Sequence, residues 1–170
     1  MSDFQSPSTG LTLALNSGAL AAGTTAGTVK TTAAINYIVD GGFATKAITD
    51  NMSIAYAGPS VYQAPTGVGS VNGSFTGSTG GSTRLFLLGL NAAGALSVVP
   101  GAFVDSADLA AGRVALQFPD EPFGVCVIGA LRVAVTAGTS FTPGATALGA
   151  TGVTSTFLNL ADVPANPLTA

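Results

Sequence analysis

Apolar and polar residues alternate with a period of two in several short stretches of the chain. Such alternation is typical of a strand with one buried face and one exposed face. The pattern predicts strands over residues 11–16, 28–40, 43–48 and 52–57. Residues 28–40 are the clearest case, because β-branched and aromatic residues are enriched there and strands favour both.

A second group of segments is strongly apolar along its whole length. Residues 83–90 read TRLFLLGL and predict an apolar strand. Residues 123–137 read FGVCVIGALRVAVTA and predict a central strand, or two strands joined near Gly129. Shorter segments predict further strands over residues 95–99, 113–118 and 153–158.

Glycine, proline, asparagine and aspartate separate these segments. Residues 40–42 (Asp-Gly-Gly) predict a tight hairpin turn, and residues 100–101 (Pro-Gly) are expected to close another hairpin. Residues 105–112 predict one short helical turn that Asp105 starts and Gly112 ends. The predicted fold class is all-β, an antiparallel sandwich or barrel of short strands with at most one short helix.

The same signals divide the chain into parts. Residues 1–27 form an N-terminal arm and the first strand, residues 28–165 a β-rich domain, and residues 166–170 a tail. Residues 58–82 are rich in glycine and proline, so they predict an exposed loop, or else a linker between two lobes. We favour the loop. A chain of 170 residues is long enough to bury a core without disulfides.

Ionisable residues are scarce, and this excludes several kinds of function. Charged residues make up 8% of the chain, which has no histidine and one cysteine. The commonest general base and metal ligand is therefore absent, and a Cys-based zinc site is excluded. We expect no enzyme, no metal and no cofactor. Five basic residues against eight acidic ones argue against nucleic acid as a partner. No apolar run approaches the ~18–20 residues of a membrane-spanning helix, so we expect no membrane partner.

So few charges cannot cover the surface of an ordinary soluble monomer. Because the cores of protein interfaces are depleted in charge, the composition favours a subunit covered by other chains over a monomer coated with serine and threonine. Six residues are candidates for such an interface: Phe4, Leu11, Leu13, Phe75, Arg84 and Arg132.

Three of these candidates have specific alternatives. Phe4 is the one large apolar residue of the first ten that we take as a mobile arm, so it either anchors on a neighbour or belongs to a disordered terminus. Arg84 and Arg132 each lie in an apolar strand, where a lone cation is costly to bury. We expect both to face solvent; the alternative is an acid such as Asp40 or Asp50, within the chain or across a subunit boundary.

The remaining candidates for chemistry have simpler structural interpretations. Asp120 and Glu121 are adjacent and bounded by prolines, which favours a solvated loop tip over a catalytic pair. Asp105 and Asp108 fit a helix cap better than a calcium site. Cys126 lies in an apolar segment and predicts a buried small hydrophobe. Three tyrosines are candidates for a sugar-stacking surface, although strand and rim positions are the simpler interpretation: Tyr37, Tyr56 and Tyr62.

Most of the chain beyond residue 28 resembles small capsid decoration proteins of tailed bacteriophages, also called cement or head-stabilisation proteins. The stretches that carry the likeness are VKTTAAINYIVDGGFATKAITDNMSIAYA (29–57), STRLFLLGLNAAGALSVVPG (82–101), PFGVCVIGALRVAV (122–135) and SFTPGATALGATGVTSTFLNLADVP (140–164). The likeness lies in the style and order of the segments and not in a signature motif.

The resemblance implies a β-rich virion protein, commonly an oligomer and often a trimer, made in the host cytoplasm and bound to the outer capsid surface. Its partner would be the major capsid protein, and its function would be to bridge and stabilise capsid subunits. The family has no catalytic residues to transfer to this chain. Some related phage proteins belong to tails, fibres or baseplates, so a component that contacts host surface glycan is the alternative.

Overall fold

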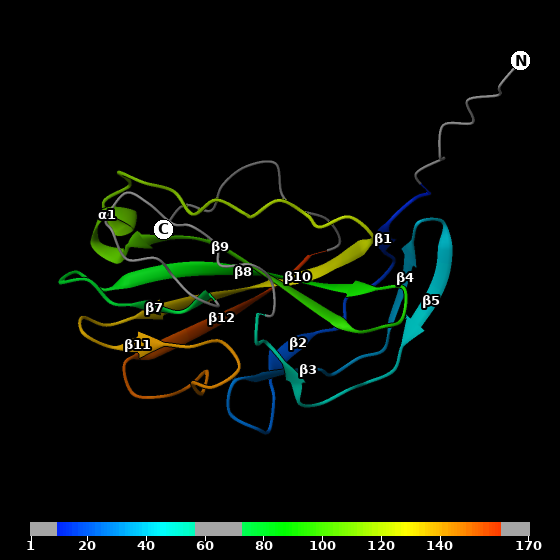
Figure 1. Ribbon diagram of the computed structural model, residues 1–170, viewed down its shortest axis with the longest axis horizontal. Coiled ribbons are helices and arrows are strands. Elements are labelled where there is room, and N and C mark those ends of the chain that lie inside the picture. Colours follow the sequence, from blue (N-terminus) through cyan, green and yellow to red (C-terminus); the bar gives the residue numbers. More distant parts are fainter. Residues whose placement is uncertain (1–9, 57–72, 161–170) are drawn as a thin grey trace, which may run out of the picture.

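The two strongly apolar segments lie side by side at the centre of a four-stranded antiparallel sheet (Figure 1). The computed structural model describes residues 10–56 and 73–160. The main sheet has the strand order β12 (Val153–Asn159), β10 (Val125–Val135), β8 (Ser82–Asn91), β9 (Leu96–Asp105). Each neighbouring pair is antiparallel, so the predicted all-β antiparallel class is confirmed.

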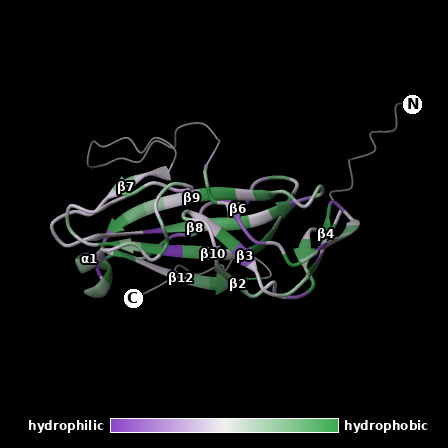
Figure 2. Cartoon of the chain, turned by 90° about the horizontal axis from the view of Figure 1, so that it is seen from below, coloured by the Kyte–Doolittle hydropathy of each residue, from purple (hydrophilic) through white to green (hydrophobic). Residues whose placement is uncertain are grey.

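Both faces of the main sheet are covered, which explains why its central strands are apolar throughout. Every residue of 82–90 is buried. Phe86 faces the larger of two hydrophobic clusters, whereas Leu85, of the opposite parity, packs with Leu109 and Leu116 on the other face. Figure 2 shows the hydrophobic colour running along these strands.

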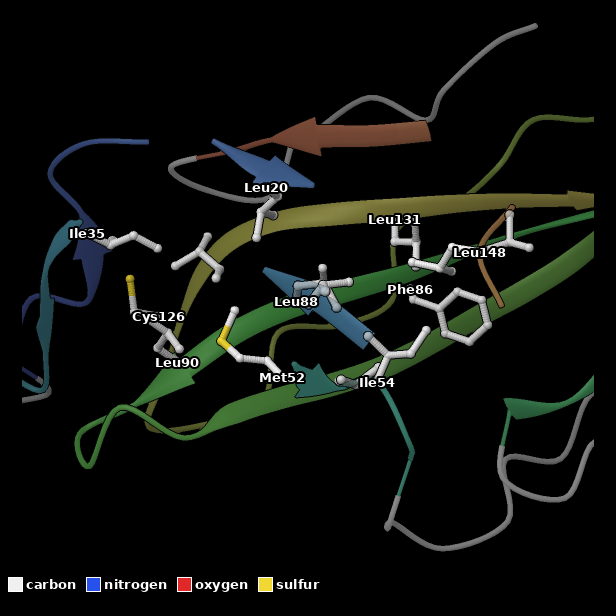
Figure 3. Packing of buried hydrophobic residues seen from close by; sticks show 14 of the residues in the cluster. Leu20, Ile35, Met52, Ile54, Phe86, Leu88, Leu90, Cys126, Leu131 and Leu148 are labelled. Carbon is white, nitrogen blue, oxygen red and sulfur yellow. The ribbon is translucent and has the colours of Figure 1, made fainter. Parts of the chain in front are cut away.

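Short strands form a second layer against the larger cluster. They are arranged as three small sheets: β1 (Leu13–Ala14), β4 (Ile35–Val39) and β5 (Gly42–Lys46); β2 (Leu20–Ala22), β3 (Thr28–Thr31) and β6 (Met52–Ser53); β7 (Phe75–Thr76) and β11 (Ser140–Phe141). In Figure 3, Leu20 and Ile54 from this layer lie near Leu88 and Phe86 of the main sheet, and Ile35 lies toward Cys126 and Leu90. The packing is consistent with a β-sandwich.

Residues 28–40 form two strands and not the single strand predicted. β3 pairs with β2 and β6, whereas β4 pairs with β1 and β5. Between them the backbone N–H groups of Thr32 and Ala33 donate to the carbonyl oxygen of Gly18 at 3.0 and 3.1 Å. The chain therefore passes from one small sheet to another, and the alternation of side chains does not reveal this change of partner.

Two other strands are continuous: β9 at a point where the sequence predicted a turn, and β10 at a point where it left one strand or two strands open. β9 runs through Pro100 and Gly101, so these residues do not close the hairpin. β10 is one strand, with a shift of register against β8 between Val127 and Gly129. A bulge lets a strand continue with one extra residue. Proline is tolerated in β9 because an edge strand does not need every N–H group for pairing.

Two local predictions are confirmed. Asp40 and Gly41 have φ angles of 50° and 80° and form the tight turn from β4 to β5. The helix α1 (Ser106–Ala110) begins at the N-cap Asp105, whose carboxylate accepts backbone N–H groups of the first turn. Residues 113–118, by contrast, form no strand.

Within the segment 58–82, predicted as an exposed loop, the structure places residues 75–76 in the strand β7, whereas residues 78–80 are exposed. Phe75 lies in β7 and is buried, with its ring 5.9 to 6.5 Å from the rings of Phe86, Phe103 and Phe141. Aromatic rings at such distances attract one another and bury a large apolar area. Residues 57–72, like the arm residues 1–9 and the tail, lie outside the described residues.

Candidate interaction surface

The sheet β1–β4–β5 lies at the opposite end of the molecule from α1 (Figures 1 and 2). One of its faces belongs to the core. Ile35, Tyr37 and Val39 of β4 are buried in the larger cluster, whereas Asn36 is exposed and Ile38 half-buried. Since successive side chains of a strand point to opposite faces, Ile38 lies on the side that faces away from the core.

Five apolar side chains share this outward side. Leu13 of β1, Ile38 of β4 and Phe43 of β5 form one row, because the strand register pairs Leu13 with Ile38 and Ile38 with Phe43. Leu11 and Leu15 stand two residues to either side of Leu13, so the pleat places them on the same side. We call these five residues the outer face.

The outer face is largely exposed to solvent. Leu11, Leu15 and Phe43 retain 60%, 50% and 68% of their accessible surface. Burying a leucine or phenylalanine side chain contributes about 1.5–3 kcal/mol, so this surface gains several kcal/mol when a partner covers it. Contiguous apolar patches of this kind mark interaction sites in soluble proteins.

Hydrogen bonds on the core side and at the margins hold the outer face in place. The Tyr37 hydroxyl donates to the backbone oxygen of Asn91 at 3.2 Å, and burial raises the pKa of Tyr37. The Asn16 side chain accepts the N–H of Asn36 at 2.7 Å and donates to the oxygen of Ala34 at 2.7 Å. The outer face is therefore preformed, and a preformed surface has a lower entropic cost of binding than one that orders on contact.

Phe123 adds a further exposed aromatic side chain beside this sheet. It retains 86% of its accessible surface and lines a shallow groove together with Gly10 and Asp40. Asp40 belongs to the turn between β4 and β5. The apolar surface around this end of the molecule thus extends beyond the five residues of the outer face.

Of the six predicted interface residues, the structure brings two together on the outer face, namely Leu11 and Leu13. Phe4 lies outside the described residues. Phe75 and Arg84 are buried inside the chain and present no surface to a partner. The sequence analysis missed Leu15, Ile38 and Phe43, although the alternation in residues 11–16 and the turn at 40–42 together place them beside Leu13.

Arg84 is fully buried, so the expectation that it faces solvent is wrong. Its Nε donates to the backbone oxygen of Gly101 at 2.7 Å, and its Nη1 to that of Gly73 at 2.9 Å. Its guanidinium lies 5.7 Å from the ring centre of Phe86, a cation–π contact. Burial lowers the pKa of Arg84 to about 10, so it stays protonated at neutral pH. Arg84 thus joins β8 to β9 and to the residues before β7.

Arg132 lies on the main sheet, on the face opposite to the larger cluster. It stands beside Leu85 of β8 and Thr156 of β12 and is half-buried. Among the described residues a salt bridge joins Arg113 to Asp108 at 3.1 Å. No salt bridge in this part of the chain joins Arg132 to Asp40 or Asp50, the acids proposed for it.

The carboxylates of the described residues fulfil structural roles or lie in solvent. Asp50 accepts bonds from Thr24, which lower its pKa, and Asp105 caps α1 and accepts from Ser78, which lowers its pKa as well. Asp120 and Glu121 are exposed. Cys126 is buried, as predicted. In residues 10–56 and 73–160 no group of three or more His, Cys, Asp or Glu is placed to hold a metal ion.

The three tyrosines do not form one surface. Tyr37 is buried in the core, so it is unavailable for stacking on a sugar. Tyr56 is half-buried and lines a groove with Asn91 and Asp120. Tyr62 lies outside the described residues.

Comparison with models of protein families, with curated proteins and with solved structures finds no match to this chain. Within the described part of the chain, no helix has the length and apolar character needed to cross a membrane.

Proposed function

We propose that this chain is a virion structural protein that decorates and stabilises a phage capsid on its outer surface. The observation that carries the proposal is the outer face, a preformed and exposed apolar surface on a chain with very few charges. The resemblance to decoration proteins gives the partner, the major capsid protein, and favours a trimer. The chain acts by covering apolar surface and not by chemical catalysis.

Such a protein stabilises a shell by mass action. A ligand that binds only the assembled state stabilises that state by a free energy that grows with the logarithm of the ligand concentration once this exceeds the dissociation constant. An interface of about 1,200–2,000 Å² suffices for specific binding. Contacts repeated over many copies in a shell add up to a large total effect, although no single contact needs to be tight.

The test is binding of the purified chain to expanded heads of the phage that encodes it, followed by the temperature at which the heads disrupt. We expect the chain to raise that temperature. Phe43→Ser is expected to weaken binding about 10- to 100-fold, since it removes one apolar side chain from the interface. Val114→Ser, a matched change of a partly exposed apolar residue beyond α1, should leave binding unchanged. Absence of binding to any form of the head would contradict the proposal.

Location in the particle provides an independent test. Labelled chains or antibodies on intact particles should mark the head. A signal confined to the tail would overturn the proposal and favour a tail, fibre or baseplate component that contacts glycan.

A further inference from the structure

The two edges of the main sheet differ in how they are protected. At the β9 edge, Gln117 and Pro119 pack against Gly101, and Pro100 has no N–H group to donate to a further strand. At the other edge, β12 pairs with β10 in an unbroken register and has no second strand partner among the described residues. Figure 2 shows β12 at the lower margin of the molecule.

The sequence of β12, VTSTFLN, contains none of the usual protections of an edge strand. It has no charge, no proline and no bulge, and natural proteins use these features to keep other strands from pairing. An open edge of this kind accepts another strand, whose main-chain hydrogen bonds provide affinity while side-chain contacts provide specificity.

The hydrogen bonds at the two ends of β12 determine which of its main-chain groups face outward. The carbonyl oxygen of Gly152 and the N–H group of Leu160 both bond to β10 or to the residue that follows β10. Along an antiparallel strand, residues that bond to the partner alternate with residues whose main-chain groups point away from it. The even-numbered residues of β12 therefore bond to β10. The odd-numbered ones, with Ser155 and Phe157 in the middle, direct their N–H and C=O groups to the open edge.

A second copy of β12 satisfies these outward groups in one register. Thr156 is the midpoint of the strand, and with Thr156 opposite Thr156, Ser155 of one copy lies opposite Phe157 of the other. Both are outward residues, so each such pair exchanges two main-chain hydrogen bonds, about four in total. A shift by one residue would set outward groups against inward ones. The pairing ends before Asn159, because its side chain already accepts the N–H of Leu20 at 2.9 Å.

The side chains that this register brings together are neutral and complementary in size. Thr156 is exposed and meets its own copy, and threonine pairs across strands are favourable. On the other face Phe157 is half-buried at the margin of the larger cluster, and the small Ser155 opposite leaves room for its ring. Arg132 stands beside Thr156 in the register. The two copies of Arg132 lie three strand spacings apart, about 14 Å, which exceeds the Debye length of about 8 Å at physiological salt.

We propose that β12 of one copy pairs with β12 of a second copy, antiparallel and centred on Thr156, so that the two main sheets form one continuous sheet. The same surface serves both copies, so the contact closes at two chains and covers the open edge of each. The inference goes beyond the proposed function, because the contact needs no capsid. A twofold contact cannot close a ring of three, so in a trimeric protein it joins chains of different trimers.

A single introduced cysteine tests the register, because only the residue on the twofold axis meets its own copy. Thr156→Cys places two thiols on Cα atoms about 4.5 Å apart, which suits a disulfide. The control Thr154→Cys is also exposed on the same face, but its two copies lie about 14 Å apart, too far for a disulfide. Cys126 is buried and stays in both variants. After mild oxidation we expect about 10-fold more covalent dimer from Thr156→Cys. Equal yields would overturn the inference.

A charge exchange provides a second readout that needs no cysteine. Thr156→Lys and Thr156→Glu each set like charges opposite one another, so each is expected to weaken dimerisation about 5-fold in sedimentation equilibrium. An equimolar mixture of the two should restore it, because lysine then faces glutamate. Thr154→Lys, which lies opposite Leu158, should have a smaller effect. An unsubstituted chain that stays monomeric, or a mixture that does not recover, would overturn the β12 contact and leave the test of capsid binding untouched.

Discussion

The main sheet and the small sheet β1–β4–β5 use apolar strands in different ways. β8 is buried on both sides, by the larger cluster and by the cluster around Leu85. β4 is buried on one side, and its outward neighbours Leu11 and Phe43 remain mostly exposed. Apolar side chains thus form the core on both sides of β8, whereas on the outward side of β4 they remain available for association.

The difference between the two sheets predicts its largest effect on the free energy of unfolding when one phenylalanine in each sheet is truncated. Phe86→Ala is expected to lower the free energy of unfolding by about 3–5 kcal/mol, because it leaves a cavity in the larger cluster. Phe43→Ala should change it by no more than about 0.5 kcal/mol, since its ring is already in solvent. Chemical denaturation of both variants measures the difference. Equal losses would refute the division between core sheet and exposed sheet.

The next effect concerns the buried cation of the main sheet. Arg84→Met keeps the approximate volume but removes the donors that satisfy the oxygens of Gly101 and Gly73. Leaving buried polar atoms unpaired costs about 1–3 kcal/mol of stability, which urea titration would detect. Arg132→Met is the matched control on the same sheet and should cost less than about 0.5 kcal/mol. If Arg84→Met left the free energy of unfolding unchanged, these hydrogen bonds would contribute nothing to stability.

A smaller effect is expected at the turn that shapes the small sheet. Gly41 has a φ of 80°, a conformation that disfavours a side chain, so Gly41→Ala should cost about 1–2 kcal/mol. The control is Gly149→Ala, because a methyl group there meets no neighbouring atom and φ is not positive. Thermal unfolding compares the two. The same variant should weaken binding through the outer face, since this turn sets the position of Phe43 opposite Ile38.

The smallest effect is a pH dependence at the N-cap of α1. Hydrogen bonds from Ser78 and from the backbone N–H of Ala107 lower the pKa of Asp105 below its ordinary 3.8. A carboxyl whose pKa is lower in the folded state stabilises that state above the unfolded pKa. This contribution is lost as the pH falls through the folded value. Asp105→Asn keeps a capping oxygen without the charge, so its stability should decline less steeply below pH 3.8. Identical acid profiles for the two proteins would contradict this role.

Local signals in the sequence were sufficient where the structure depends on adjacent residues. The turn at Asp40 and Gly41 and the cap at Asp105 follow from backbone preferences within a few residues, and both are confirmed. Cys126 was correctly expected to be buried because its whole segment is apolar. By contrast, residues 28–40 were predicted as one strand, since alternation does not show that the chain changes sheets at Thr32.

The candidate surface was only partly predictable for a related reason. Leu11 and Leu13 were identified from composition and alternation, but Phe43 joins them only through the register of three strands. Arg84 and Phe75 were misplaced because a charged residue in an apolar strand and a phenylalanine in a glycine-rich segment favour exposure on average. Both residues found partners distant in sequence, at Gly101 and Phe141.

Period, turn residues and caps act over a few residues, so they were enough to predict antiparallel strands and one capped helical turn. Which apolar faces are covered depends on the packing of the whole chain. Alternation distinguishes the two faces of a strand, but burial depends on what packs against each face. In the larger cluster that contact is made by residues far away in the chain, such as Leu20 and Leu88.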